Sequence, residues 1–242
     1  REQYHRPEHQ QKVVEDILDN WIQYSQNNKF HGMFATSSIA EAIEYYRLFK
    51  KLKPELKITA LFDPNIDNNE NAKFKEDGLV EIISDYNNRY GMEFSLATHA
   101  KMKRDIADRL AHKELYKRVE HAPEKQLELL IVVDQMLTGF DSKWVNTLYL
   151  DKMLEYANLI QAFSRTNRLF GKDKPFGIIR YYRRPHTMQR NIDAAVKLYS
   201  GDKPLALFVD KLQDNLKRLN AIFTDIEQLF KNAGIKNFEK LP

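Results

Sequence analysis

Short apolar segments alternate with amphipathic segments along the first 184 residues, and this alternation constrains the fold more than any other feature of the sequence. Residues with strand preference, many of them β-branched or aromatic, predict strands at 32–36, 57–62, 127–133, 145–150 and 176–182. Apolar residues at helical spacing predict helices at 8–28, 39–52, 72–90, 99–118 and 156–169. Strands that alternate with helices pack as a mostly parallel sheet covered by helices, so the sequence predicts an α/β fold.

After Pro185 the strand-like segments stop, and the pattern becomes helical. Residues 186–200 and 204–232 are predicted helices, separated by a turn that contains Gly201 and Pro204. We therefore expect a sheet-containing domain at 1–184 and the beginning of a helical domain at 185–242.

Composition excludes several classes of function. The chain has no cysteine, which removes disulfides, thiolate nucleophiles and Cys-based metal sites and fits the reducing cytoplasm. The seven histidines are scattered, so we expect no metal site. No apolar run approaches the roughly 18 residues of a membrane span, so we expect no membrane association. The net charge is only +4, so any contact with nucleic acid must come from a local patch. The chain begins at Arg1, which suggests a piece of a longer protein.

Ligands of parallel α/β sheets gather at the carboxyl ends of the strands, and hydroxyl groups follow the first predicted strand. Thr36, Ser37 and Ser38 stand where that strand ends and the next helix begins. Free backbone N–H groups at a helix start favour an anion such as phosphate. The alternative is a simple helix cap, because Ser38 and Glu41 have the spacing of a capping box.

A loop that combines a glycine, a hydroxyl and a carboxylate follows the third predicted strand. It contains Thr138, Gly139 and Asp141. Glycine lets a phosphate approach the backbone, and the carboxylate could accept a hydrogen bond from a sugar hydroxyl. The alternative is an ordinary turn, since this short pattern is common in loops.

Gln161, Arg165 and Arg168 have offsets of zero, four and seven within the predicted helix 156–169. On a helix these offsets place the three side chains on one face. Two planar, permanently charged guanidinium groups beside an amide could clamp a phosphoryl group during its transfer. The alternative is a solvated polar helix face.

These three segments, in this order, resemble three motifs of the second motor lobe of superfamily 2 helicases, which has a RecA-like fold. Residues 34–37 resemble motif IV, 130–141 resemble motif V and 161–168 resemble motif VI. Motif VI is usually written Q-x-x-G-R-x-G-R, and Ser164 and Asn167 replace its two glycines here.

The wording of these segments is similar to the restriction (R) subunit of bacterial type I restriction-modification enzymes. The similarity is carried by Val-Val-Asp-Gln-Met-Leu-Thr-Gly-Phe-Asp at 132–141, Leu-Tyr-Leu-Asp-Lys at 148–152 and Leu-Ile-Gln-Ala-Phe-Ser-Arg-Thr-Asn-Arg at 159–168. Residues 174–177 and 191–199 continue it, so the resemblance covers nearly the whole chain.

The resemblance implies roles at a nucleotide site. Arg165 and Arg168 would be arginine fingers that reach ATP, which would be held with Mg²⁺ mainly by a first motor lobe. Gln161 would support the two arginines, and Gly139 and Asp141 would line the nucleotide side of the cleft.

The resemblance also implies partners. Thr36, Ser37 and Thr138 would contact the backbone of double-stranded DNA. Further partners would be the methyltransferase and specificity subunits of the restriction complex and, in the intact chain, a first motor lobe and a nuclease domain. A basic group near the last predicted strand (Arg180, Arg183, Arg184 and Arg190) could also follow a DNA backbone.

Two catalytic motifs are missing from the sequence. There is no G-x-x-x-x-G-K-[ST] phosphate-binding loop and no nuclease motif of the D…E-x-K type. We therefore expect the chain to be part of an ATP-dependent type I site-specific deoxyribonuclease and to be inactive in isolation. The alternatives are the motor lobe of another superfamily 2 enzyme of DNA repair or remodelling, and a non-catalytic module whose helices at 186–232 dock partner subunits.

Overall fold

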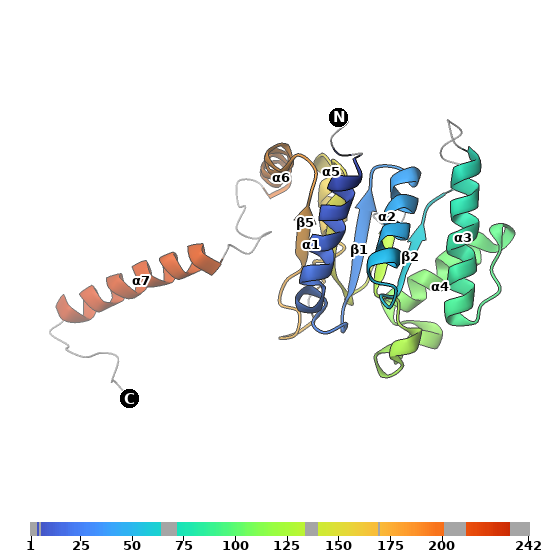
Figure 1. The fold of residues 1–242 in the computed structure, drawn as a ribbon. Helices are drawn as coiled ribbons and strands as arrows, with labels where there is room; N and C mark the ends of the chain where they lie inside the picture. Colours follow the sequence, from blue (N-terminus) through green and yellow to red (C-terminus); the bar gives the residue numbers. More distant parts are fainter. Residues whose placement is uncertain are drawn as a thin grey trace. The chain divides into compact units, whose positions relative to one another are not determined.

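A five-stranded parallel sheet forms the centre of the protein (Figure 1). The computed structural model describes residues 4, 6–63, 72–133, 140–168, 170–200 and 212–232. The strands are β1 (His31–Thr36), β2 (Ile58–Leu61), β3 (Leu129–Val132), β4 (Val145–Asp151) and β5 (Ile178–Tyr181). Their order across the sheet is β2-β3-β1-β4-β5, and every neighbouring pair is parallel. The predicted α/β fold is confirmed.

Helices cover both faces of this sheet. Three lie on one face: α1 (Pro7–Ser25), α2 (Ile39–Leu52) and α3 (Ala72–Tyr90), with α2 packed between the other two (Figure 1). On the opposite face lie α4 (His99–Ala111) and α5 (Tyr156–Phe163). The described helices are completed by α6 (Pro185–Ser200) and α7 (Leu212–Asn232).

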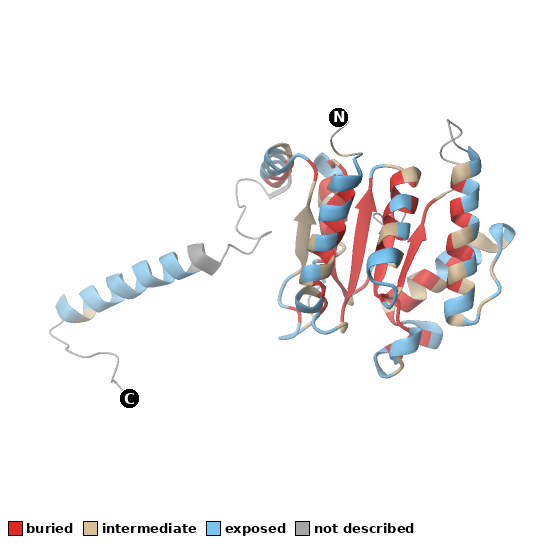
Figure 2. Ribbon diagram, viewed as in Figure 1, coloured by how far each residue is buried: buried red, intermediate tan, exposed pale blue. Residues whose placement is uncertain are grey.

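The hydrophobic core lies between the sheet and these helices (Figure 2). All residues of the central strands β1, β3 and β4 are buried, as expected for parallel strands covered on both faces. On the α2 face, the Phe34 ring makes edge contacts with Tyr45 and Phe49, at centroid distances of 4.7 and 6.2 Å. The sheet therefore supports the loops that follow the carboxyl ends and precede the amino ends of its strands.

The chain leaves β1 and β4 toward opposite faces of the sheet. After β1 it enters α2, and after β4 it enters α5 on the other face (Figure 1). Because β1 and β4 are neighbours, their carboxyl ends form a topological switch point, where open α/β sheets usually bind ligands.

Three predicted helices end before their sequence pattern suggested. The helix predicted at 8–28 ends at Ser25, because Gln26, Asn27 and Asn28 adopt left-handed conformations. The prediction 156–169 was wrong beyond Phe163, because the hydroxyls of Ser164 and Thr166 donate to the carbonyls of Gln161 and Phe163 and compete with helical bonding. The prediction 99–118 ends at Ala111, since His112 adopts a left-handed conformation with φ of 51°. Short 3-10 turns follow at Glu114–Tyr116, Val119–His121 and Pro123–Lys125.

The chain divides into two compact units, residues 1–195 and 196–242. In the second unit, α7 carries a set of exposed apolar side chains at helical spacing: Leu216, Leu219, Ile222, Phe223, Ile226 and Leu229. The expected domain boundary at 184/185 stays a prediction. None of the described helices combines the length and apolar character that crossing a membrane requires.

Candidate functional site

Three charged side chains from two distant segments form what we call the arginine cluster: Arg165, Arg168 and Asp141. Arg168 Nη2 lies 2.7 Å from Asp141 Oδ2, and their side chains are 63% and 54% exposed. Partial burial lowers the pKa of the Arg165 guanidinium, the Asp141 carboxylate opposes this shift, and Arg168 adds to it. The Asp141 carboxylate is therefore ion-paired with Arg168 and acts on Arg165 through its charge.

Arg165 is held in place by neutral acceptors. Its Nε donates to the carbonyl oxygen of Gln161 at 3.0 Å, and its Nη2 donates to Ser164 Oγ at 2.8 Å. The expectation of one shared helix face was wrong, because α5 ends at Phe163 and both arginines lie in the segment after it. Gln161 supports Arg165 through its backbone carbonyl, while its side chain is exposed.

The arginine cluster lies near the amino end of β4 and not at the carboxyl edge of the sheet. Asp141 stands four residues before Val145, the first residue of β4. The neighbouring Ser142 is buried, and its hydroxyl donates to the Leu110 carbonyl at the end of α4. The segment that carries Asp141 is thus anchored on one side of the sheet. Thr138 and Gly139, the other predicted residues of this loop, lie outside the residues that the structure describes.

The hydroxyls predicted at the end of β1 are engaged in internal hydrogen bonds. Thr36 is buried, and its hydroxyl donates to the carbonyls of Ser38 and Val132. The Ser37 hydroxyl donates to the Asp151 carbonyl at 3.1 Å, and the Ser37 N–H donates to Glu41. Ser38 Oγ accepts from the Glu41 N–H and caps α2, as the capping interpretation predicted.

A buried ion network, which we call the switch-point network, fills the space between the carboxyl ends of β1 and β4. The Arg183 guanidinium donates to Ser37 Oγ at 2.7 Å, to Glu41 Oε1 at 3.1 Å and to Asp151 Oδ2 at 3.0 Å. Burial alone would lower the pKa of Arg183, but hydrogen bonding to Asp151 and the charges of Asp151 and Glu41 raise it. The Arg183 guanidinium therefore stays charged between the two carboxylates.

Two further side chains complete the coordination of Asp151, which is fully buried. The Tyr45 hydroxyl donates to Asp151 Oδ2 at 2.8 Å, and His9 Nε2 lies 3.0 Å from Asp151 Oδ1. Burial, followed by the charge of Asp151, raises the pKa of the Tyr45 hydroxyl, so Tyr45 remains a donor. The sequence analysis did not predict this network. The available signal was Asp151, a carboxylate at the end of an apolar strand.

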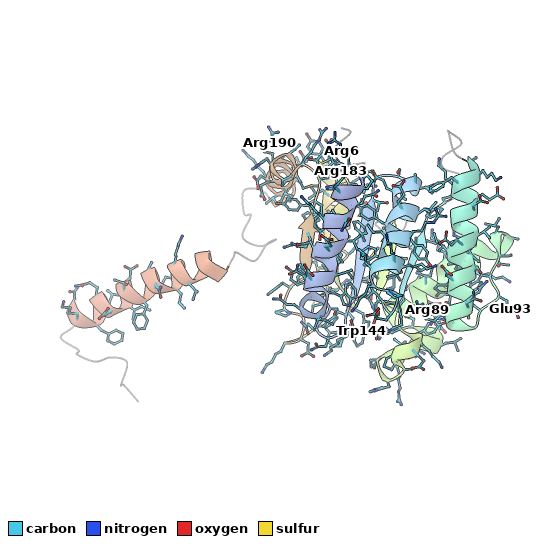
Figure 3. The ribbon with its side chains drawn as sticks, in the orientation of Figure 1. Arg6, Arg89, Glu93, Trp144, Arg183 and Arg190 are labelled. Carbon is cyan, nitrogen blue, oxygen red and sulfur yellow. The ribbon has the colours of Figure 1, made fainter. Side chains whose placement is uncertain are left out.

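The basic group near β5 separates into paired and unpaired members. Arg180 donates to both carboxylate oxygens of Asp16, at 2.7 and 2.8 Å, and Arg183 belongs to the switch-point network. Arg184 and Arg190 are exposed, and neither forms an ion pair with any described residue. Figure 3 shows Arg6, Arg183 and Arg190 at the same end of the domain. Within the described part of the chain, Arg184 and Arg190 are therefore the members of the predicted basic group without an ion pair.

No group of three or more His, Asp or Glu side chains within the described ranges is arranged to hold a metal ion.

Comparison with known families gives the class of the protein. Residues 28–184 match the family described as type I restriction enzyme subunit R domain 3. Because this match covers more than half of the chain, the chain belongs to that family. The resemblance to the R subunit is confirmed.

Individual relatives are described as endonuclease subunits of type I restriction enzymes. The chain is 37% identical over 196 residues to the endonuclease subunit of a type I restriction enzyme from Staphylococcus aureus strain COL, covering 78% of this chain and 20% of the relative. It is 26% identical over 230 residues to a putative type I restriction enzyme endonuclease subunit from Methanocaldococcus jannaschii, covering 95% of this chain and 19% of the relative. The chain thus spans about a fifth of the length of these relatives.

Proposed function

We propose that this chain is the second motor lobe of an ATP-dependent translocase of double-stranded DNA within a type I restriction enzyme. Family membership, the parallel α/β sheet and the relatives' description as endonuclease subunits support this proposal. The alternative of a repair or remodelling motor is set aside, because the chain belongs to the restriction subunit family.

The arginine cluster is the observation that carries the proposal. Among the described residues, Arg168 pairs with one carboxylate, that of Asp141, and both side chains are more than half exposed. Exposed ion pairs of this kind contribute roughly 0–1 kcal/mol, so a more highly charged anion can replace the carboxylate. Guanidinium groups bind phosphate oxygens through two parallel hydrogen bonds, so the cluster fits the phosphates of ATP.

In the proposed mechanism, Arg165 and Arg168 act on ATP that is held, with Mg²⁺, mainly by a first motor lobe. ATP supplies the phosphoanhydride bond whose hydrolysis drives the cycle. Arg165 is already oriented by the Gln161 carbonyl and by Ser164, whereas Arg168 exchanges Asp141 for the phosphate. Asp141, together with Gly139, then faces the nucleotide.

The proposed motion follows from the same electrostatics. Attraction between the arginines and the terminal phosphate closes two lobes around ATP, and loss of that phosphate weakens the attraction and lets them open. Repeated closing and opening moves the lobes along the DNA backbone. Because the sequence lacks the phosphate-binding loop motif, we propose that the isolated chain does not hydrolyse ATP.

We also propose that the end of β1 faces the DNA backbone, with Thr36, Ser37 and Thr138 as the nearest hydroxyls. The internal hydrogen bonds restrict this role. Thr36 is buried, and Ser37 can donate to a phosphate only if it releases the Asp151 carbonyl. The methyltransferase and specificity subunits, and the nuclease domain of the intact chain, complete the proposed set of partners.

The test replaces Arg168 or Arg165 by alanine in the intact subunit, assembled with its partner subunits. We expect DNA-stimulated ATP hydrolysis to fall by about 10³-fold or more, since an arginine finger contributes about 10³ to 10⁵ in rate. Arg118→Ala, which removes an exposed arginine elsewhere, is the matched control. Unchanged ATP hydrolysis in folded Arg165→Ala and Arg168→Ala subunits would refute the finger role.

A second candidate function, docking of partner subunits, is favoured by the apolar stripe of α7. Monomeric soluble proteins seldom expose apolar side chains in such a continuous set. Replacing Leu219 and Ile226 by lysine in the intact subunit should then prevent assembly with the methyltransferase and specificity subunits. Normal assembly of this variant, measured by size-exclusion chromatography, would remove the docking function.

A further inference from the structure

Lys174 is a fully buried lysine in the segment that follows the arginine cluster. Its ammonium group donates to the carbonyl oxygens of Lys143 at 3.1 Å and Val145 at 2.7 Å. No carboxylate of the described part of the chain forms an ion pair with it. Lysine is almost never fully buried unless it is paired, so the position of this side chain requires an explanation.

Burying an ammonium group opposes folding. Burial lowers the pKa of Lys174 to about 8, and the charge of Asp141 opposes this shift. Two backbone carbonyls satisfy part of the hydrogen-bonding capacity of the group but none of its charge. A buried apolar side chain of the same length would avoid this penalty.

The contacts of Lys174 join the two segments that form the arginine cluster. Lys143 and Val145 come two and four residues after Asp141, whereas Lys174 comes six residues after Arg168. Backbone hydrogen bonds in both directions between Phe170 and Lys174 close a small loop at this point. Lys174 thus links the segment that carries the two arginines to the segment that carries Asp141.

The chain just before β5 also packs closely against a residue that lies between the two arginines. A side chain at Gly177 would place its Cβ only 2.4 Å from Thr166 Cβ and from the Thr166 carbonyl oxygen. Thr166 is buried, and its hydroxyl donates to the Phe163 carbonyl at the end of α5. Because Gly177 is only three residues from Lys174, the contact between Gly177 and Thr166 connects Lys174 to the residues between Arg165 and Arg168.

The arginine cluster needs such a constraint. Its own ion pair is exposed, and a pair of this kind does not hold two long side chains in one geometry. A catalytic group displaced by about 1 Å can lose about 10²-fold in rate. Buried contacts beneath the arginine cluster must therefore fix the positions of its two segments relative to each other.

We propose that Lys174 is a positioning residue that fixes the arginine-bearing segment against the Asp141 segment and so aligns Arg165 and Arg168 with the phosphate. Lys174 touches neither arginine and acts only through the backbone that it ties. This inference rests on the proposed function, because it assigns the arginines a phosphate to meet.

The experiment compares Lys174→Met with the matched control Lys172→Met in the intact subunit, assembled with its partners. Methionine keeps the length and the packing of the lysine stem but removes the donor, and Lys172 is an exposed lysine of the same loop. We expect kcat of DNA-stimulated ATP hydrolysis to fall by about 10²-fold in Lys174→Met, with KM for ATP within about twofold. Lys172→Met should match the unmodified subunit.

A double variant separates positioning from a general loss of structure. If Lys174 acts through the arginines, combining Lys174→Met with Arg168→Ala should lower kcat no further than Arg168→Ala alone. If the two substitutions instead lower kcat by the product of their separate effects, the proposal is wrong. If Lys174→Met does not give a folded subunit, Gly177→Ala displaces the same segment and should show the same non-multiplied loss; a normal kcat there would also overturn it.

The two proposals can fail separately. A normal rate in Arg168→Ala would remove the finger role and the positioning role with it. A loss in Arg168→Ala together with a normal kcat in Lys174→Met would leave the finger role intact and remove only the role of Lys174.

Discussion

Two of the places where arginine meets carboxylate in this protein have opposite properties. In the switch-point network, the side chains of Arg183, Glu41 and Asp151 are 10%, 4% and 0% exposed. In the arginine cluster, those of Arg168 and Asp141 are 63% and 54% exposed. The buried network is fixed by several hydrogen bonds, whereas the exposed pair can exchange its partner. The comparison separates an arginine that holds the fold together from an arginine that is available to a ligand.

Breaking the buried network should have the largest effect on stability. Arg183→Ala leaves the carboxylates of Asp151 and Glu41 buried without their shared cation, and removing one partner of a buried pair costs about 3–5 kcal/mol. Chemical denaturation of the purified chain measures this loss. The adjacent exposed Arg184→Ala should change the free energy of unfolding by no more than about 0.5 kcal/mol. Equal effects of the two substitutions would show that burial does not distinguish them.

Lys174, which is buried beneath the arginine cluster, should have an intermediate, pH-dependent effect on the free energy of unfolding. The pKa of Lys174 is lowered from 10.5 to about 8, so between these values the unfolded chain holds a proton that the folded chain has released. Stability contributed by this group therefore rises with pH from about 8 to 10.5, by up to about 1.4 kcal/mol per pH unit.

Lys174→Met should remove this contribution, and Lys172→Met should retain it. Denaturation of the purified chain at several pH values from 7.5 to 10.5 provides the comparison. A difference between Lys174→Met and the unmodified chain that stays constant with pH would contradict the lowered pKa.

Breaking the exposed pair should have the smallest effect. Asp141→Asn removes the charge that Arg168 contacts, but exposed pairs contribute only about 0–1 kcal/mol. We expect the free energy of unfolding to change by less than about 1 kcal/mol, measured by the same denaturation. Asp151→Asn is the informative counterpart, because it leaves Arg183 buried beside a neutral amide. A large loss in Asp141→Asn would mean that the arginine cluster is structural.

Local patterns predicted most of the fold. The helices predicted at 39–52 and 72–90 have the bounds of α2 and α3, because a capping serine and regular apolar spacing fixed them locally. The α5 prediction extended too far, since helical spacing of Gln161, Arg165 and Arg168 carries no information about the hydroxyls that end the helix.

The site was predicted less completely than the fold. Asp141, Arg165 and Arg168 were selected from sequence, and the structure brings Arg168 and Asp141 into contact. The switch-point network could not be predicted from local patterns, because its contacts join residues that are far apart in the chain. Arg183 lies 32 residues from Asp151 and 142 residues from Glu41. Only the parallel order of the strands makes them neighbours.

The first helix has a practical consequence for anyone who wishes to excise this domain. The family match begins at residue 28, after α1 has ended. Yet α1 buries Val13, Ile17 and Trp21, and it supplies His9 to Asp151. A fragment that begins at residue 28 would expose the apolar surface of the sheet that α1 covers. It would also remove His9, one of the partners of the buried Asp151 carboxylate. An excised domain should therefore include α1 and His9.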